Sequence, residues 1–550
     1  MKSLKITPFN IIVFLSAMVF TSMFIVYWLP VSIVAVNLIF AAVVWGYLIF
    51  YKNLPEYITS NMRIPDIVVA LLGVIGLGAA RYELMIEIFE RIKITKAPLI
   101  ATNSIINFML NNISLFIYCG LIVVAIISFL LFAWLSIKIK PVMIDIFKKM
   151  DMTERFFLYA TSVILIVFSV LLFSKTTIFY NPADEKGQGI NDVIYVSDSG
   201  SIVGGNAFIN PEHGENDIRQ PLFGVFAMPF ASIIKAISLP FPISWLYPLL
   251  LNCLQIFLLL MSIILIVRMM EFSGTLRKLL ILILFVSSYS VMLFSFMMEQ
   301  YIFAVWWLTL FLYFTVVYKK INILLLIAAT GSLITSVVLA LPFIGYLKNI
   351  RNAMVEIGKF SLIFISLIFA FGLLNVLFIA PTHTVDLINA FGGASITGMN
   401  KLYQFTAFIT NMFTAPEFAT SINVYGSPQI VLPSYSAVNL YGVAIFTMIS
   451  AGFCLNYKKI ISKVCFCWCL FSVLLLLLVG YGAQENGMIL FSLYFLWAFM
   501  SLMISLINRL FNKLPVIEYG FYMMASVFML FHNIRAMIDI FHFGVNHYPQ

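Results

Sequence analysis

Long apolar stretches recur from one end of this chain to the other, separated by short polar segments. A membrane-spanning helix needs about 20 apolar residues to cross about 30 Å of hydrocarbon, and in an open chain only a helix satisfies its own backbone polar groups there. Charged residues make up 10% of the sequence, whereas soluble domains carry about 25%. The sequence therefore predicts an all-α integral membrane protein.

The apolar stretches predict about 13 to 15 transmembrane helices. The first two stretches follow each other too closely for a cleaved signal peptide, so we interpret both as retained spans. The expected spans are residues 11–29, 31–51, 66–80, 113–137, 156–174, 241–267, 277–297, 301–318, 321–331, 334–347, 360–380, 437–455, 464–480, 487–507 and 517–534.

Two stretches fit a simple span poorly. Residues 66–80 are short for a crossing and rich in glycine, which is compatible with a re-entrant segment. Residues 321–347 are too long for one crossing and short for two, with Thr330-Gly331-Ser332 at their middle. That tripeptide predicts a broken helix, and the basic residues at both ends favour a hairpin.

Basic residues give the chain a net charge of +9, but they are spread over many short loops. They form no continuous stripe for phosphates to follow, so nucleic acid is not an expected partner. On the expected map, 22 of the 32 basic residues lie on the side of the N-terminus. The positive-inside rule then predicts a multi-pass plasma-membrane protein with a cytoplasmic N-terminus and an external C-terminus.

One polar segment, residues 175–240, lies between long apolar stretches and is expected on the extracytoplasmic side. Its first part is rich in Gly and Asn, and its second part, Pro221–Leu239, is apolar and typical of helices in the membrane interface. We expect N-terminal spans over 1–155, a core with this outer loop over 156–380, and a second outer loop with C-terminal spans over 381–550. Residues 381–436 are interpreted as loops with short helices.

Asp198 is the first candidate for a functional side chain. It begins Asp198-Ser199-Gly200 and is followed by Gly204-Gly205-Asn206, glycines that allow a tight turn and leave a carboxylate presented. An Asx-turn or helix-capping residue is the alternative interpretation.

Three further candidates follow. Asp217 and Arg219 directly precede Gln220-Pro221 at the start of the apolar part of the loop. Arginine is suited to a lipid phosphate at that depth, and a local Asp217–Arg219 ion pair is the alternative. Glu299 lies between two apolar stretches, where an acid is either partnered or marks a short loop.

No motif for a cofactor is present. The sequence lacks a GxxxxGK[ST] nucleotide-binding run and the spacing of a calcium-binding loop. All six cysteines lie in apolar stretches and are expected to be packing residues. We predict no cofactor and no metal site, with a divalent cation left open because the outer segment carries several acids.

The order of these features resembles the GT-C superfamily of glycosyltransferases: an acid in a polar outer loop, Asp217–Phe223 leading into an apolar segment, and Glu299-Gln300-Tyr301 opening a later span. The resemblance is to bacterial polytopic members of the mannosyltransferase and aminoarabinose-transferase kind, and it covers about Phe156–Leu347. Four spans precede that region, and Gln220 stands where many members have His.

The resemblance implies transfer of a sugar from a polyprenyl-phosphate donor to a saccharide, lipid or protein acceptor at the outer face. Asp198 would be the base, and Arg219 would steady the lipid phosphate. Asp217, Gln220 and Glu299 would complete the substrate-binding set. A lipid-linked saccharide flippase or other transporter, and a polysaccharide polymerase or ligase, remain the alternatives.

Overall fold

We describe a computed structural model of the chain. It describes residues 6–24, 31–95, 113–180, 182, 193–195, 197–204, 207–209, 219–346, 350–373, 392, 396–422, 426–483 and 487–550. This part is almost entirely helical, with one two-stranded antiparallel sheet formed by β1 (Ala419–Ile422) and β2 (Pro428–Val431). The all-α prediction is confirmed at this level.

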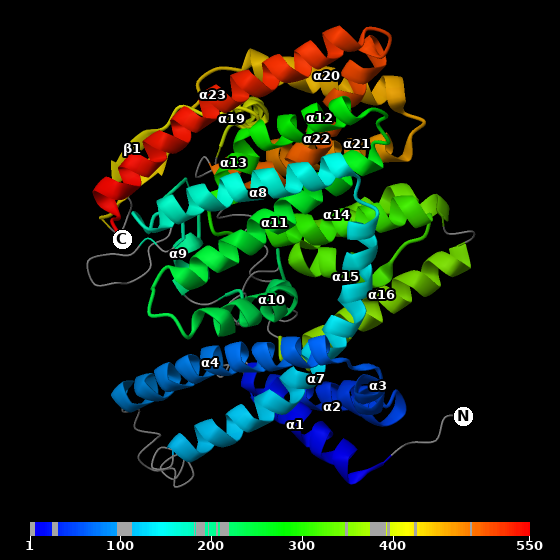
Figure 1. Cartoon of the computed structure of the whole chain (residues 1–550), viewed down its shortest axis with the longest axis vertical. Coiled ribbons are helices and arrows are strands. Elements are labelled where there is room, and N and C mark those ends of the chain that lie inside the picture. Colours follow the sequence, from blue (N-terminus) through cyan, green and yellow to red (C-terminus); the bar gives the residue numbers. More distant parts are fainter. Residues whose placement is uncertain are drawn as a thin grey trace.

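The first helices gather at one end of the long axis (Figure 1). They are α1 (Pro8–Phe24), α2 (Val31–Gly46), η1 (Tyr47–Tyr51), α3 (Leu54–Asn61), α4 (Ile64–Thr95) and α7 (Ile113–Lys148). The long helix α7 packs against α4 and runs to the start of α8 (Met152–Phe173), which lies in the upper part of the molecule (Figure 1).

The middle of the chain forms the centre of the molecule. Its elements are α9 (Ser199–Gly204), α10 (Phe223–Ser238), α11 (Leu246–Met269), α12 (Thr275–Ser287), α13 (Tyr289–Phe296), α14 (Tyr301–Tyr318), α15 (Ile323–Ser332), the 3₁₀ segment η3 (Ile334–Tyr346) and α16 (Ile350–Ala370). Helices α11 and α14 pack together and are largely buried. They therefore form the structural core.

The C-terminal part covers the other side of this core. It consists of α19 (Gly398–Asn411), the β1–β2 hairpin, α20 (Leu440–Asn456), α21 (Ile460–Ser472), the π-helix η5 (Val473–Val479), the 3₁₀ turn η6 (Gly487–Phe491), α22 (Ser492–Phe511) and α23 (Pro515–His547). Helix α22 is the most buried candidate span, and α23 crosses the top of the view (Figure 1). The hairpin in residues 381–436 differs from the expected loops and short helices.

Ten helices of the described residues are long and apolar enough to cross a membrane, or eleven if the bent pair α12–α13 counts as one span. Five shorter apolar helices add to these. The expected 13 to 15 crossings included several of the shorter segments. The described helices thus support a multi-pass membrane protein, with fewer full-length spans than hydropathy alone indicated.

The expected span 66–80 lies within the continuous helix α4, in which residues 64–84 form a candidate membrane span, so the re-entrant alternative is wrong. Its glycines serve packing. A Cβ at Gly73 would lie 2.5 Å from the Phe132 ring, and a Cβ at Gly76 would lie 1.7 Å from the carbonyl oxygen of Ser232. Glycine here permits close approach of α7 and α10 to α4.

The expected single span 277–297 is bent by 64° between α12 and α13. Backbone groups released at the bend find partners in the segment after α19: Tyr289 N–H donates to the Phe413 carbonyl at 3.0 Å. The buried Asn533 side chain of α23 joins both sides by donating to the carbonyls of Ser287 and Phe413 at 2.8 and 2.9 Å. Backbone groups at the bend therefore form hydrogen bonds with other parts of the protein.

The expected break at Thr330–Ser332 is confirmed. Helix α15 ends at Ser332, and Leu333 has an extended backbone before η3 begins. The segment preceding α10 fills the break: Leu222 N–H donates to the Gly331 carbonyl and Ile334 N–H donates to the Arg219 carbonyl, both at 2.8 Å. Residues 219–222 therefore lie against the end of α15.

Helix α10 packs against neighbouring helices, and its expected position in the membrane interface stays a prediction. It runs alongside α4, a candidate span (Figure 1), and Lys235 pairs with Glu83 of α4 at 3.1 Å. Its first turns pack against α14, where the rings of Phe226 and Trp307 lie 5.8 Å apart. The apolar side chains of Pro221–Leu239 thus pack against other helices. An interfacial helix has a similar apolar composition.

Candidate functional site

Asp198 and Glu299 lie side by side although 101 residues separate them. The backbone N–H of Asp198 donates to Glu299 Oε1 at 2.8 Å. Asp198 is half-buried, whereas Glu299 is only 1% exposed. Asp198 directly precedes α9, and its carbonyl accepts from Ile202 N–H at 2.9 Å. The residue therefore occupies the helix-start position considered from the sequence and also belongs to a pair of acids.

Buried groups fix the connection that carries Glu299, between α13 and α14. The Gln255 side chain of α11 donates to the Glu299 carbonyl at 2.6 Å, and Met298 N–H donates to the Phe179 carbonyl at 2.8 Å. Gln255 lies nine residues after Leu246, the first residue of α11, or about 14 Å along the helix axis. Glu299 is thus recessed below the end of α11 and not at a protein surface.

The surroundings of Glu299 favour its protonated form. Burial raises the pKa of this carboxyl well above its ordinary value of 4.5, and the Asp198 carboxylate raises it further, while Arg219 acts in the opposite direction. A protonated carboxyl donates a hydrogen bond as well as accepting one. Glu299 can therefore accept from the Asp198 backbone with one oxygen and donate with the other.

Arg219 and Gln220 form one wall of a cavity of about 210 Å³. Gln300 and Tyr301 of the α13–α14 region also line it, which brings the cavity next to Glu299. Its remaining wall comes from η3, α21, η5, η6 and α22 and is largely aromatic and aliphatic, with Leu333, Ile334, Thr335, Trp468, Leu475, Val479, Tyr481, Phe491, Tyr494 and Phe495.

The polar groups of this cavity are positioned by tyrosines. Arg219 Nη1 donates to Tyr481 Oη at 3.4 Å, and Gln220 Nε2 donates to Tyr494 Oη at 2.9 Å. Gln220 is 5% exposed, and its Oε1 has no hydrogen-bond partner among the described residues. A buried acceptor without a partner is costly. Gln220 therefore offers an acceptor to a ligand hydroxyl.

Of the five predicted site residues, the structure brings four together: Asp198, Arg219, Gln220 and Glu299. Asp217 lies outside the described residues, so its pairing with Arg219 stays a prediction. Within the described ranges, no group of three or more His, Cys, Asp or Glu side chains is arranged to hold a metal ion.

Sequence reasoning missed Gln255, Tyr481 and Tyr494. Gln255 had a signal, since an amide in a long apolar stretch requires a partner there. The tyrosines had none, because the chain contains 25 of them and only tertiary contacts distinguish these two.

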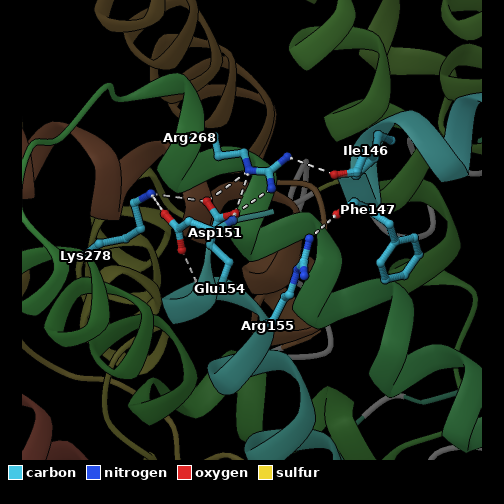
Figure 2. Close-up of polar contacts among 7 residues, drawn as sticks. All are labelled: Ile146, Phe147, Asp151, Glu154, Arg155, Arg268 and Lys278. Carbon is cyan, nitrogen blue, oxygen red and sulfur yellow. Dashed lines mark hydrogen bonds and ion pairs between the residues drawn. The ribbon is translucent and has the colours of Figure 1, made fainter. Parts of the chain in front are cut away.

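A second polar cluster lies around Arg268, in the last turn of α11 (Figure 2). Asp151 and Glu154 form a capping box at the start of α8. Arg268 donates through Nε to both oxygens of Glu154 at 2.9 and 3.0 Å, and Lys278 pairs with Asp151 and, at 3.3 Å, with Glu154. Two acids and two cations balance one another, which indicates a structural role.

Comparison with protein-family models, with curated proteins and with solved structures gives no match for this chain.

Proposed function

We propose that this protein is a GT-C-like membrane glycosyltransferase that moves a sugar from a polyprenyl-phosphate donor to an acceptor at the extracytoplasmic face. The observation that carries the proposal is that the acids Asp198 and Glu299 lie near Arg219, which lines a mostly apolar cavity. A lipid phosphate needs both an apolar wall and a cation, and this cavity offers the two together.

The proposed reaction uses Asp198 as general base. Its carboxylate takes the proton of the acceptor hydroxyl while the acceptor oxygen bonds to the anomeric carbon. The bond from that carbon to the phosphate oxygen breaks, and the polyprenyl phosphate leaves with the electron pair. A positioned base contributes about 10² to 10⁴ in rate, and Arg219 stabilises the charge that develops on the phosphate.

Glu299 and Gln220 are proposed to orient the sugar or the acceptor. A protonated Glu299 carboxyl would donate a hydrogen bond to substrate, and Gln220 Oε1 would accept one. Gln220 cannot titrate, so it binds substrate without acting as acid or base. Asp217 completes the substrate-binding set as predicted from the sequence.

The proposed sidedness rests on the two ends of α11. Gln255, which binds the Glu299 backbone, lies in the half of α11 nearer Leu246, whereas Arg268 and the basic first turn of α12 lie at the other end. The positive-inside rule assigns the basic end to the cytoplasm. The catalytic loop 175–240 of the core 156–380 would then lie on the extracytoplasmic side of the cell membrane, and the N-terminus would lie in the cytoplasm.

A transfer assay tests the proposal. Purified protein in liposomes is supplied with a panel of polyprenyl-phosphate sugars and with a cell-envelope extract as acceptor, and free polyprenyl phosphate is measured by mass spectrometry. We expect release that requires the extract, and we expect Arg219→Gln to raise the KM for donor by about tenfold. Arg509→Gln, which removes a cation at the end of α22, is the matched control.

A lipid-linked saccharide flippase is the second candidate, favoured by the break at Leu333 beside Arg219–Leu222. Broken helices with cavity-lining backbone are typical of transporters. The same liposomes separate the two functions: movement of intact donor between leaflets, without release of polyprenyl phosphate under any acceptor condition, would establish the flippase and reject the transferase.

A further inference from the structure

A depression of about 260 Å³ lies at the turn between α7 and α8, and none of its lining residues lines the cavity of the candidate site. The residues that line it are Phe147, Lys148, Met150, Arg155, Leu158 and Tyr159. It therefore combines two cationic side chains with aromatic and aliphatic ones.

The acids around this depression are already neutralised by other cations. Asp151 and Glu154 are held by Lys278 and Arg268 (Figure 2), and Asp145 pairs with Lys149 at 2.7 Å.

Lys148 and Arg155 remain as uncompensated charge. Across the part of the chain that the structure describes, neither forms an ion pair, and Arg155 donates only to the Phe147 carbonyl at 3.5 Å. Both side chains are exposed. The depression thus carries two positive charges without a protein counter-ion.

The position of the depression matches the depth of lipid headgroups. It lies between a candidate span that ends at Lys148 and one that begins at Met152. Below it, α8 exposes apolar side chains spaced four residues apart, so they form one stripe along the helix. The stripe consists of Tyr159, Val163, Val167 and Leu171, each between 53 and 65% exposed.

We propose that this depression binds an anionic glycerophospholipid of the adjacent leaflet, with its headgroup phosphate between Lys148 and Arg155 and an acyl chain along the α8 stripe. Arginine and lysine both donate to phosphate oxygens. A zwitterionic lipid brings its own cation next to the phosphate, so it gains less from two protein cations. A soluble phosphate lacks the chain that the stripe contacts.

Lipid binding to the purified full-length protein tests this site. Retention of phosphatidylglycerol and of phosphatidylcholine is measured by native mass spectrometry during lipid titration, for wild type and for a variant combining Lys148→Gln and Arg155→Gln. Each cation near a membrane surface contributes about 1 kcal/mol, so we expect phosphatidylglycerol to bind about 30-fold more weakly to the double variant, with little change for phosphatidylcholine.

A control removes two exposed cations elsewhere, by Lys458→Gln and Lys459→Gln at the turn between α20 and α21. It should bind phosphatidylglycerol like wild type, and all three proteins should unfold at the same temperature without lipid. Equal weakening in the control and the double variant would overturn the proposal. Displacement of phosphatidylglycerol by millimolar inorganic phosphate would overturn it too, because the site would then recognise phosphate alone.

Discussion

Buried amides, more than charges, determine where the acids of the candidate site lie. Gln255 anchors the backbone of Glu299, and Gln220 is anchored by Tyr494. Among the described residues of this site, Glu299 is the one fully buried carboxyl, and burial raises its pKa. Asp198 is half-buried. The contrast assigns different roles to two neighbouring acids, as differing environments do in other acid–base sites.

Glu299→Gln tests this contrast through stability. Burial raises the pKa of Glu299 in the folded protein above its value in the unfolded chain. The folded protein is therefore most stable at a pH below the unfolded-state pKa, and it loses stability as pH rises from there toward the folded-state pKa. Gln keeps the acceptor oxygen and never ionises. We expect wild type and Glu299→Gln to unfold at the same temperature at about pH 4. At about pH 8 we expect the variant to unfold about 2 °C or more above wild type.

Thermal unfolding in nanodiscs at the two pH values measures the effect. Glu83→Gln, on the exposed side of α4, is the matched control. At either pH it should change the unfolding temperature by no more than about 1 °C. A wild type that is as stable at pH 8 as its Glu299→Gln variant would show that Glu299 is not neutralised by its surroundings.

Breaks and bends in helices position the residues of the candidate site. The break after α15 accepts residues 219–222, and the bend between α12 and α13 directs the chain toward Glu299. The tripeptide Thr330–Ser332 predicted the first break. The bend at Ser288 was not predictable, because its backbone partners come from Phe413 and its side-chain partner from Asn533, far away in sequence.

Gly331→Ala tests the packing at the first break. The added Cβ would lie 2.8 Å from Leu222 Cβ and from the Phe226 ring, so the segment carrying Arg219 must move. We expect a loss of about 1 to 3 kcal/mol in stability and weaker donor binding. Gly358→Ala on α16 meets no atom within 4 Å and should instead stabilise by up to about 1 kcal/mol. Denaturant unfolding measures the free energy of unfolding of both variants. A change of the same sign in both would contradict this packing.

Arg268→Leu tests the ion-pair network at the other end of α11. Glu154 is 2% exposed, and a buried acid that loses a partner destabilises the fold by about 3 kcal/mol even with Lys278 nearby. Arg155→Leu, one residue along from Glu154 but exposed, should change stability by less than about 0.5 kcal/mol. Similar unfolding midpoints for the two variants would mean that the network contributes no stability.

Along α11, the basic groups lie at the Arg268 end, and the candidate acids lie beside the other half of the helix, near its middle. Hydropathy alone predicted the class and most span positions, because a membrane leaves helices as the only open-chain solution. It misplaced helix ends: α7 continues through Pro141 to Lys148, and α23 continues to His547. Helices that project beyond the hydrocarbon have no apolar signal for their last turns, so their length follows from tertiary contacts.

Single-cysteine labelling tests the arrangement of the two ends. In a variant whose six native cysteines are replaced by Ser, Met152→Cys and Lys458→Cys should react from the cytoplasm, whereas Ser421→Cys in β1 should react with an impermeant reagent from outside. All three positions lie outside the candidate spans or at their first residue. Labelling of Ser421→Cys from the same side as Met152→Cys would reverse the sidedness.

The most direct test of the central claim is the rate of polyprenyl-phosphate release by wild type and by Asp198→Asn, in the same nanodiscs and with the same donor and acceptor. Asn keeps the backbone bond to Glu299 but removes the base. The account predicts a rate lower by about 10² to 10⁴, with unchanged unfolding temperature and with Asp539→Asn, on the exposed face of α23, equal to wild type. Release by Asp198→Asn at the wild-type rate would contradict it.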